Sequence, residues 1–227
     1  MKKIFLVQLF CFLSFFGFSQ QIKQILLSHK GNNTSLCFVA DQNIIIKVNT
    51  EGQVFEWGVD FGEERYNYYP GKLDKYMGRV EMYGSTDNVA YSGKVRYIGS
   101  VNITYFTAEE NQSLAGKVKS IGGNQLDYNA EFEEQATRGK IKSAGSLAIT
   151  YYGSFENESV RGKIKSIGNT TITYFTSFDD KASTGKIKSI GSYQFSYYSS
   201  FDTRMAGAMK NGFQKQLING LLFIVWG

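Results

Sequence analysis

Apolar and polar residues recur along the middle of the chain with a period of 23 residues. Units open at the glycines 93, 116, 139, 162 and 185 with the segments GKVRYIG, GKVKSIG, GKIKSAG, GKIKSIG and GKIKSIG. Three further columns keep the same phase, namely Val95, Val118, Ile141, Ile164 and Ile187; Ile103, Leu126, Ile149, Ile172 and Phe195; and Tyr105, Tyr128, Tyr151, Tyr174 and Tyr197. Such a constant phase indicates one supersecondary element repeated in space.

Each unit predicts a β-hairpin. Its two apolar runs, about eight residues each, have ordinary strand lengths, and alternation places Ile149 and Tyr151 on one face of the second strand. A glycine marks a tight turn, as in Ile167-Gly168-Asn169, and a longer polar stretch such as 179–184 ends the unit. A phenylalanine column, which Glu109 interrupts, keeps the same period and comprises Phe132, Phe155, Phe178 and Phe201.

The hairpin unit allows two all-β arrangements, an extended antiparallel meander or a β-solenoid. Each unit carries two basic residues two positions apart, in the pairs Lys94/Arg96, Lys117/Lys119, Lys140/Lys142, Lys163/Lys165 and Lys186/Lys188. In a solenoid, equivalent lysines would stack about 4.8 Å apart and repel by about 1 kcal/mol per neighbouring pair. A meander doubles this spacing to about 9.6 Å, beyond the physiological Debye length of about 8 Å, so we favour it.

The flanks of the array predict terminal caps, because a regular array would leave open sheet edges. Residues 20–77 form the predicted N-terminal β segment, with a hairpin over 43–57. The predicted array covers 78–212, and 213–227 form the predicted C-terminal capping strand.

Residues 1–19 have the pattern of a signal peptide. Lys2 and Lys3 precede an uncharged apolar run that ends at Gly17-Phe18-Ser19, and the run is short for a membrane span. We therefore expect an exported protein, periplasmic, secreted or attached to the cell surface, with no integral span once the leader is removed.

Charge and cysteine content limit the function classes. Removing the two leader lysines lowers the net charge from +5 to about +3, which does not indicate nucleic-acid binding. Cys11 leaves with the leader, so the remaining Cys37 has no intramolecular disulfide partner. Its apolar surroundings favour a buried, inert thiol.

Catalytic residue types are sparse. His29 is the single histidine, and pairing it with Cys37 as a nucleophile is less favoured than an exposed loop histidine beside a packed thiol. No cofactor motif or transition-metal cluster is evident, and the acidic repeat loops do not follow a calcium-loop pattern. Carboxylates gather before the array, which leaves open an envelope hydrolase with a paired-acid site there; they are Asp60, Glu63, Glu64, Asp74 and Glu81.

A surface of lysines beside aromatic rings is the main candidate for binding. Such a surface stacks sugars or holds an anionic polymer or a protein, although lysine stems over rings are also ordinary packing. The candidate residues are Lys140, Lys142, Tyr152, Lys163, Lys165, Phe175, Lys186, Lys188 and Tyr198.

The repeat resembles MORN-type hairpin repeats in unit length, in aromatic and glycine content and in successive antiparallel strands. The hallmark glycine-rich Tyr-x-Gly pattern is missing, so the resemblance is architectural and assigns no residue a role. The sequence favours an exported, non-enzymatic structural or binding protein with a protein or glycan partner. The alternatives are the envelope hydrolase and an outer-membrane β-barrel, although the Gly-Lys-Ile-Lys-Ser-Ile-Gly strand is short for the latter.

Overall fold

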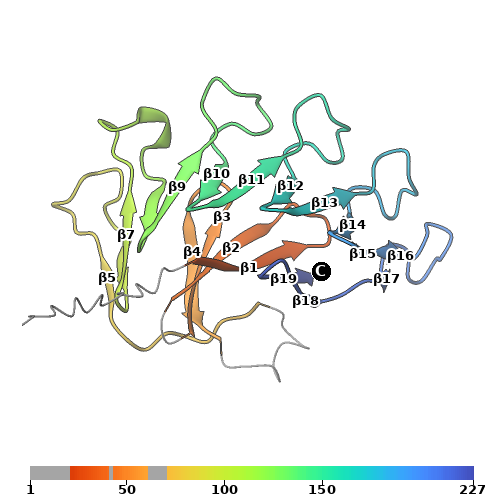
Figure 1. Cartoon of the computed structure of the whole chain (residues 1–227), viewed down its shortest axis with the longest axis horizontal. Helices are drawn as coiled ribbons and strands as arrows, with labels where there is room; N and C mark the ends of the chain where they lie inside the picture. The colour runs from red at the N-terminus through yellow and green to blue at the C-terminus, as the bar shows by residue number, and fades with distance from the viewer. Residues whose placement is uncertain (1–20, 41–42, 61–70) are drawn as a thin grey trace, which may run out of the picture.

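A computed structural model describes residues 21–40, 43–60 and 71–227, so the predicted signal peptide lies outside the described residues. The described chain is almost entirely β-structure, with one short 3-10 helix, η3 (Gln112–Leu114). Its strands form a six-stranded sheet, an eleven-stranded sheet and a two-stranded sheet (Figure 1).

The eleven-stranded sheet is an open antiparallel meander of successive hairpins, which confirms the predicted fold class and rejects the solenoid. Its strands neighbour one another in chain order, and β5 and β15 form its two ends. The strands are β5 (Val80–Met82), β6 (Val95–Ile98), β7 (Val101–Tyr105), β8 (Val118–Ile121), β9 (Asn124–Tyr128), β10 (Ile141–Ala144), β11 (Leu147–Tyr151), β12 (Ile164–Ile167), β13 (Thr170–Tyr174), β14 (Ile187–Ile190) and β15 (Tyr193–Gln194). β16 (Ser196–Tyr197) and β17 (Met209–Asn211) pair separately as the last hairpin-like step.

Glycine makes the tight turn of each repeat. In the unit of β12 and β13, Ile167 pairs with Thr170, so only Gly168 and Asn169 connect the strands. Gly168 has a φ of 53°, a left-handed conformation that a two-residue hairpin turn requires and that glycine adopts without strain.

The six-stranded sheet joins the two flanks of the array. β1 (Gln21–Ser28), β2 (Thr34–Val39), β3 (Ile44–Asn49) and β4 (Val54–Val59) come from the N-terminal segment, and the 43–57 hairpin is present as β3 and β4. β18 (Lys215–Ile218) and β19 (Leu221–Trp226) come from the C-terminal segment, and β19 pairs with β1 in parallel. The two flanking segments thus lie side by side in one sheet.

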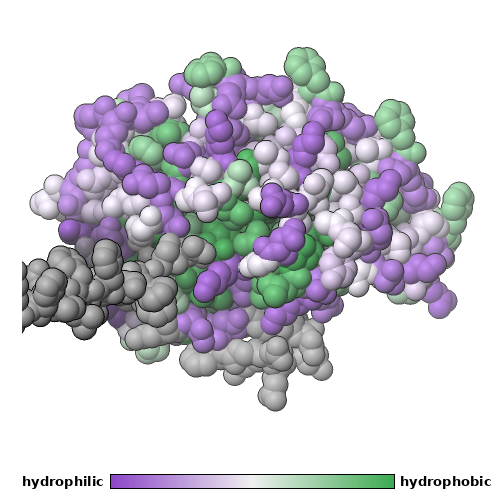
Figure 2. Space-filling model, viewed as in Figure 1, coloured by the Kyte–Doolittle hydropathy of each residue, from purple (hydrophilic) through white to green (hydrophobic). Residues whose placement is uncertain are grey.

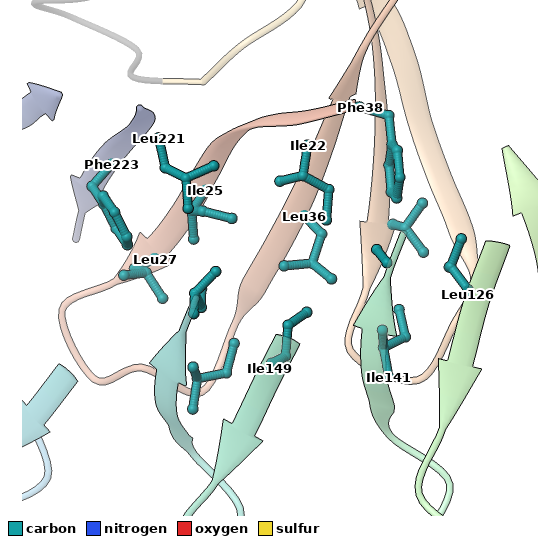
Figure 3. Packing of buried hydrophobic residues seen from close by; sticks show 14 of the residues in the cluster. Ile22, Ile25, Leu27, Leu36, Phe38, Leu126, Ile141, Ile149, Leu221 and Phe223 are labelled. Carbon is teal, nitrogen blue, oxygen red and sulfur yellow. The ribbon is translucent and has the colours of Figure 1, made fainter. Parts of the chain in front are cut away.

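The main hydrophobic core lies between the six-stranded sheet and the meander. Figure 3 shows Leu126, Ile141 and Ile149 of the meander opposite Ile25 and other large side chains of the six-stranded sheet. The repeated apolar columns are therefore the meander's contribution to this core. A smaller cluster of Leu26, Cys37, Ile45 and Ile224 belongs entirely to the six-stranded sheet.

Backbone hydrogen bonds fasten the turns of the six-stranded sheet to the meander. The amides of Val118 and Ile141 donate to the carbonyls of Gly52 and Thr50, at 2.9 and 2.8 Å, and the amide of Ile187 donates to His29 at 2.8 Å. Each donor lies beside a register shift in its strand, where the regular pairing is interrupted. In these three repeats the irregularity thus provides a donor for docking the second sheet.

Candidate binding surfaces

The first lysine of each repeat is a structural link between neighbouring units. The Lys140 ammonium donates to the carbonyl of Gly162, and that of Lys163 to Gly185, both at 2.5 Å. Lys94, Lys117 and Lys186 make the equivalent bonds to Gly116, Gly139 and Gly207. These five ammonium groups lie 4.9–5.3 Å from the ring centre of the tyrosine in their own unit.

Burial of this lysine column lowers its pKa. The pKa of Lys163 falls to about 8, first because of burial and second because of the positive charge of Lys30. The pKa of Lys140 is also lowered by burial, although the charge of Glu51 opposes the change. The last unit carries Ala208 at this position, where the array has no following repeat to receive the bond. This lysine column therefore serves the scaffold.

The second lysine of each repeat lies at the surface. Lys142, Lys165 and Lys188 are exposed, and the last two lie over the rings of Tyr152 and Phe175, with the ammonium 5.3 Å from each ring centre. Lys165 also contacts Glu156 at 3.5 Å, and Lys188 contacts Asp179 at 4.0 Å. Surface ion pairs of this kind contribute about 0–1 kcal/mol each to stability, so these two contacts stabilise the fold only slightly.

The aromatic rings of the candidate surface are half-buried and pack against neighbouring repeats. The Tyr152 hydroxyl donates to the carbonyl of Ile172 at 3.0 Å, and its ring meets that of Tyr174 edge-on. Phe175 meets Tyr197 in the same way, and Lys210 lies over Tyr198 with 5.9 Å between the ammonium and the ring centre. Of the nine candidate residues, the structure leaves Lys142, Lys165 and Lys188 exposed.

A different part of the repeat presents a fully exposed apolar row. The phenylalanine column lies at the tips of the long loops, where Phe132, Phe155, Phe178 and Phe201 are 91%, 95%, 92% and 88% exposed. Figure 2 shows hydrophobic residues projecting from the successive loops along one edge of the molecule. We call these four residues the tip row. The sequence contains their signal, a large apolar residue recurring at one position of an otherwise polar stretch.

Side-chain hydrogen bonds fix the shape of each tip loop. The residue after the tip phenylalanine is acidic, and in three loops its carboxylate accepts a backbone N–H three residues earlier. The pairs are Glu133 with Ala130, Asp179 with Thr176 and Asp202 with Ser199, at 3.2, 2.7 and 2.8 Å. Hydrogen bonds from Thr176 lower the pKa of Asp179.

Further hydrogen bonds connect successive loops. Glu134 accepts the Ser154 amide at 2.6 Å, Asn157 donates to the Ser177 hydroxyl at 2.8 Å, and Asp180 accepts the Ser200 hydroxyl at 2.8 Å. These donor and acceptor positions repeat with the period of the array. The tip row thus stands on loops that are bound to one another.

Cys37 and His29, the candidate nucleophile and base, have environments that do not suit a catalytic pair. Cys37 is completely buried, and burial raises the pKa of its thiol to about 12, which disfavours the thiolate at neutral pH. His29 is half-buried against Tyr197, and its pKa is lowered by burial and then by Lys186. Among the described residues, no three His, Cys, Asp or Glu side chains are grouped to hold a metal ion.

Among the described acidic candidates before the array, Asp60 and Asp74 lie close together beside Val59, and Glu81 lies on a different strand. Glu81 lies on β5 and forms an ion pair with Arg79 at 2.7 Å. Asp74 forms an isolated backbone bridge with Val59 of β4, and Asp60 follows that strand. Glu63 and Glu64 lie outside the described residues.

Comparisons with family models, curated proteins and solved structures find no match for this chain. Within the described ranges, no helix has the length and apolar character needed to cross a membrane.

Proposed function

We propose that this chain is an exported, non-enzymatic binding protein that contacts a protein or glycan partner through the tip row. The observation that carries the proposal is the near-complete exposure of one phenylalanine at the same position of four successive repeats. The predicted signal peptide supports export, and the sparse catalytic inventory supports a binding role.

The exposed rings are a large source of binding free energy. Burying one phenylalanine side chain contributes about 1.5–3 kcal/mol, so the four tips together contribute about 6–12 kcal/mol, which is comparable to the about 4–15 kcal/mol that association costs. Exposed apolar residues that recur in a fixed arrangement, surrounded by polar groups, are typical of interaction sites. Because hydrogen bonds already order the loops, the loops lose little conformational entropy when a partner binds.

The meander sets the spacing of the contacts. Two strands separate equivalent positions, so neighbouring units are about 9.6 Å apart within the sheet. Partners that reach several tips gain from multivalency, since each later contact is intramolecular. The scaffold therefore favours an extended partner over a small molecule.

The proposal is tested with the mature chain and two matched sets of substitutions. The first changes the tip row in Phe132→Ser/Phe155→Ser/Phe178→Ser/Phe201→Ser. The second changes the exposed lysines in Lys142→Gln/Lys165→Gln/Lys188→Gln. Capture from an envelope extract and binding to a glycan panel are compared with the unchanged protein, and thermal unfolding confirms that each variant folds.

We expect the tip variant to lose the captured protein or glycan while the lysine variant retains most of it. Equal binding by the tip variant and the unchanged protein would contradict the proposal. Loss of binding in the lysine variant alone would instead assign the binding function to the exposed lysines.

A further inference from the structure

The first two tip loops enclose a cleft that combines aromatic rings with carboxylates. The rings of Phe132 and Phe155 line it together with Glu133, Glu134 and Glu156, and the carboxylate of Glu156 also contacts Lys165 at 3.5 Å. One oxygen of Glu133 and one of Glu134 accept backbone amides, and each carboxylate has a second oxygen and further lone pairs. The cleft thus combines apolar surface with negative charge.

Charge is distributed unevenly between the tip loops and the rest of the chain. The four loops, residues 129–138, 152–161, 175–184 and 198–206, contain eight carboxylates against four basic side chains, although the whole chain has a net charge of +5. The first two loops contain five of these eight carboxylates. The tip row therefore lies along an acidic edge of a basic protein, with the strongest negative charge beside Phe132 and Phe155.

Resting on the proposed function of the tip row, we propose that its partner is a basic, extended protein segment whose arginine or lysine side chains enter this cleft. The stem of such a side chain packs along a phenylalanine ring, and its cationic head reaches the glutamates. Arginine fits best because its planar guanidinium forms charge-assisted pairs with carboxylates. An extended segment also follows the row from one loop to the next.

The same features disfavour other occupants. Anionic polymers and anionic membranes are repelled by the excess of carboxylates along the row. The projecting tips follow a curved outline in Figure 2, so a flat bilayer meets only some of them at once. A neutral glycan stacks on the rings but gains nothing from the negative charge.

The test measures binding of a fluorescent oligo-arginine peptide to the mature chain by anisotropy, at low and at physiological salt. Three variants are compared, each with unfolding measured in parallel. Phe132→Ser/Phe155→Ser removes the rings and leaves the charge unchanged. Glu133→Gln/Glu134→Gln/Glu156→Gln removes the charge and keeps an acceptor oxygen. Asp87→Asn/Glu109→Gln/Glu110→Gln removes the same number of charges from the two loops that lack a tip phenylalanine.

We expect the peptide to bind the unchanged protein and to bind more weakly at higher salt. The phenylalanine variant should bind about 5–30-fold more weakly, since two cation–π contacts of about 0.5–1 kcal/mol each are lost. The affinity of the cleft glutamate variant for the peptide should fall at least about tenfold, and the affinity of the control variant should stay within about twofold of that of the unchanged protein. Unchanged affinity in the phenylalanine variant, or an equal loss in the control, would show unspecific charge attraction and overturn the inference.

Two further probes separate this inference from the proposed function. Phosphatidylcholine vesicles and the glycan panel are tested with the unchanged protein and with the variant lacking all four tip phenylalanines. If either probe binds through the tips and the peptide does not, the basic-segment inference fails and the binding function stands. If neither these probes nor the envelope extract distinguish the two proteins, the proposed function itself fails.

Discussion

Two apolar columns recur with the same 23-residue period and have opposite environments. Ile141, Ile164 and Ile187 are buried between the sheets, whereas Phe155 and Phe178 are more than nine-tenths exposed. Both columns keep the 23-residue period over the last units of the array, so periodicity alone does not separate packing from interaction. The position within the unit does, because the isoleucines lie on strands and the phenylalanines lie at loop tips.

The largest expected effect concerns the buried column. Ile164→Ala should lower the free energy of unfolding by about 3 kcal/mol, because it removes buried methyl groups and leaves a cavity between the two sheets. Urea unfolding followed by circular dichroism measures the change. A loss below about 1 kcal/mol would show that the meander and the six-stranded sheet are loosely packed.

The docking of the six-stranded sheet is tested at Gly31. This glycine has a φ of 64°, and an added Cβ would lie 2.4 Å from Cε1 of Tyr174. Gly31→Ala should therefore lower the free energy of unfolding by about 2–3 kcal/mol, because the left-handed backbone and the steric overlap both disfavour the alanine. Gly93 is the control, since it has a φ of 76° with nothing within 4 Å of an added Cβ. Equal losses at both glycines would mean that the turn does not dock closely against Tyr174.

The two lysines of one repeat should differ in their contribution to stability. At about pH 10, where the Lys163 amine is neutral in the folded chain, Lys163→Met removes the hydrogen bond to the Gly185 carbonyl and should lower the free energy of unfolding by about 1 kcal/mol. Lys165→Met removes an exposed ammonium and should change stability by less than about 0.5 kcal/mol. Thermal unfolding of the two variants gives the comparison, and a reversed order would contradict the structural role of the first lysine column.

The internal lysines also predict how stability depends on pH. Lys163 titrates near 10.5 in the unfolded chain and near 8 in the folded chain, so the unfolded chain binds more protons between these values and stability rises with pH. Burial raises the pKa of the internal tyrosines, among them Tyr105 and Tyr128, so stability falls again once unfolded tyrosines ionise above about pH 10.

The expected result is a maximum in the thermal midpoint near pH 10, with a rise from pH 8 of about 2–4 °C after allowance for partial solvent screening. Lys163→Met should reduce the rise, with the other internal lysines still contributing to it, and leave the fall above about pH 10. A midpoint that decreases steadily from pH 8 in the unchanged protein would contradict this interpretation.

The smallest expected effect on stability is at the tip row. Phe155→Ser should change the free energy of unfolding by less than about 0.5 kcal/mol, because the ring has almost no contacts to lose. Urea unfolding beside Ile164→Ala measures the contrast directly. A loss comparable to that of the isoleucine variant would assign the tip row to the scaffold.

The sequence was sufficient for the hairpin unit and for the choice of a meander over a solenoid. Alternation and glycine spacing are local signals, and they specify strands and turns. The parallel pairing of β1 with β19 was beyond prediction, because it joins residues at opposite ends of the chain and no local pattern encodes the partner.

The candidate site was predicted less well than the fold. The lysines of one unit share a spacing of two, yet Lys163 binds Gly185 and Lys165 is exposed, and this difference depends on contacts between repeats and a register shift in the strand. The phenylalanine column was visible in the sequence. Its exposure was not, because large apolar residues in repeats usually contribute to a core.

The most direct test of the tip row is the amount of protein or glycan captured per mole of the variant Phe132→Ser/Phe155→Ser/Phe178→Ser/Phe201→Ser, relative to the unchanged protein. The result predicted here is loss of capture at an unaltered thermal midpoint. Undiminished capture by the folded variant would contradict a binding role for the tip row.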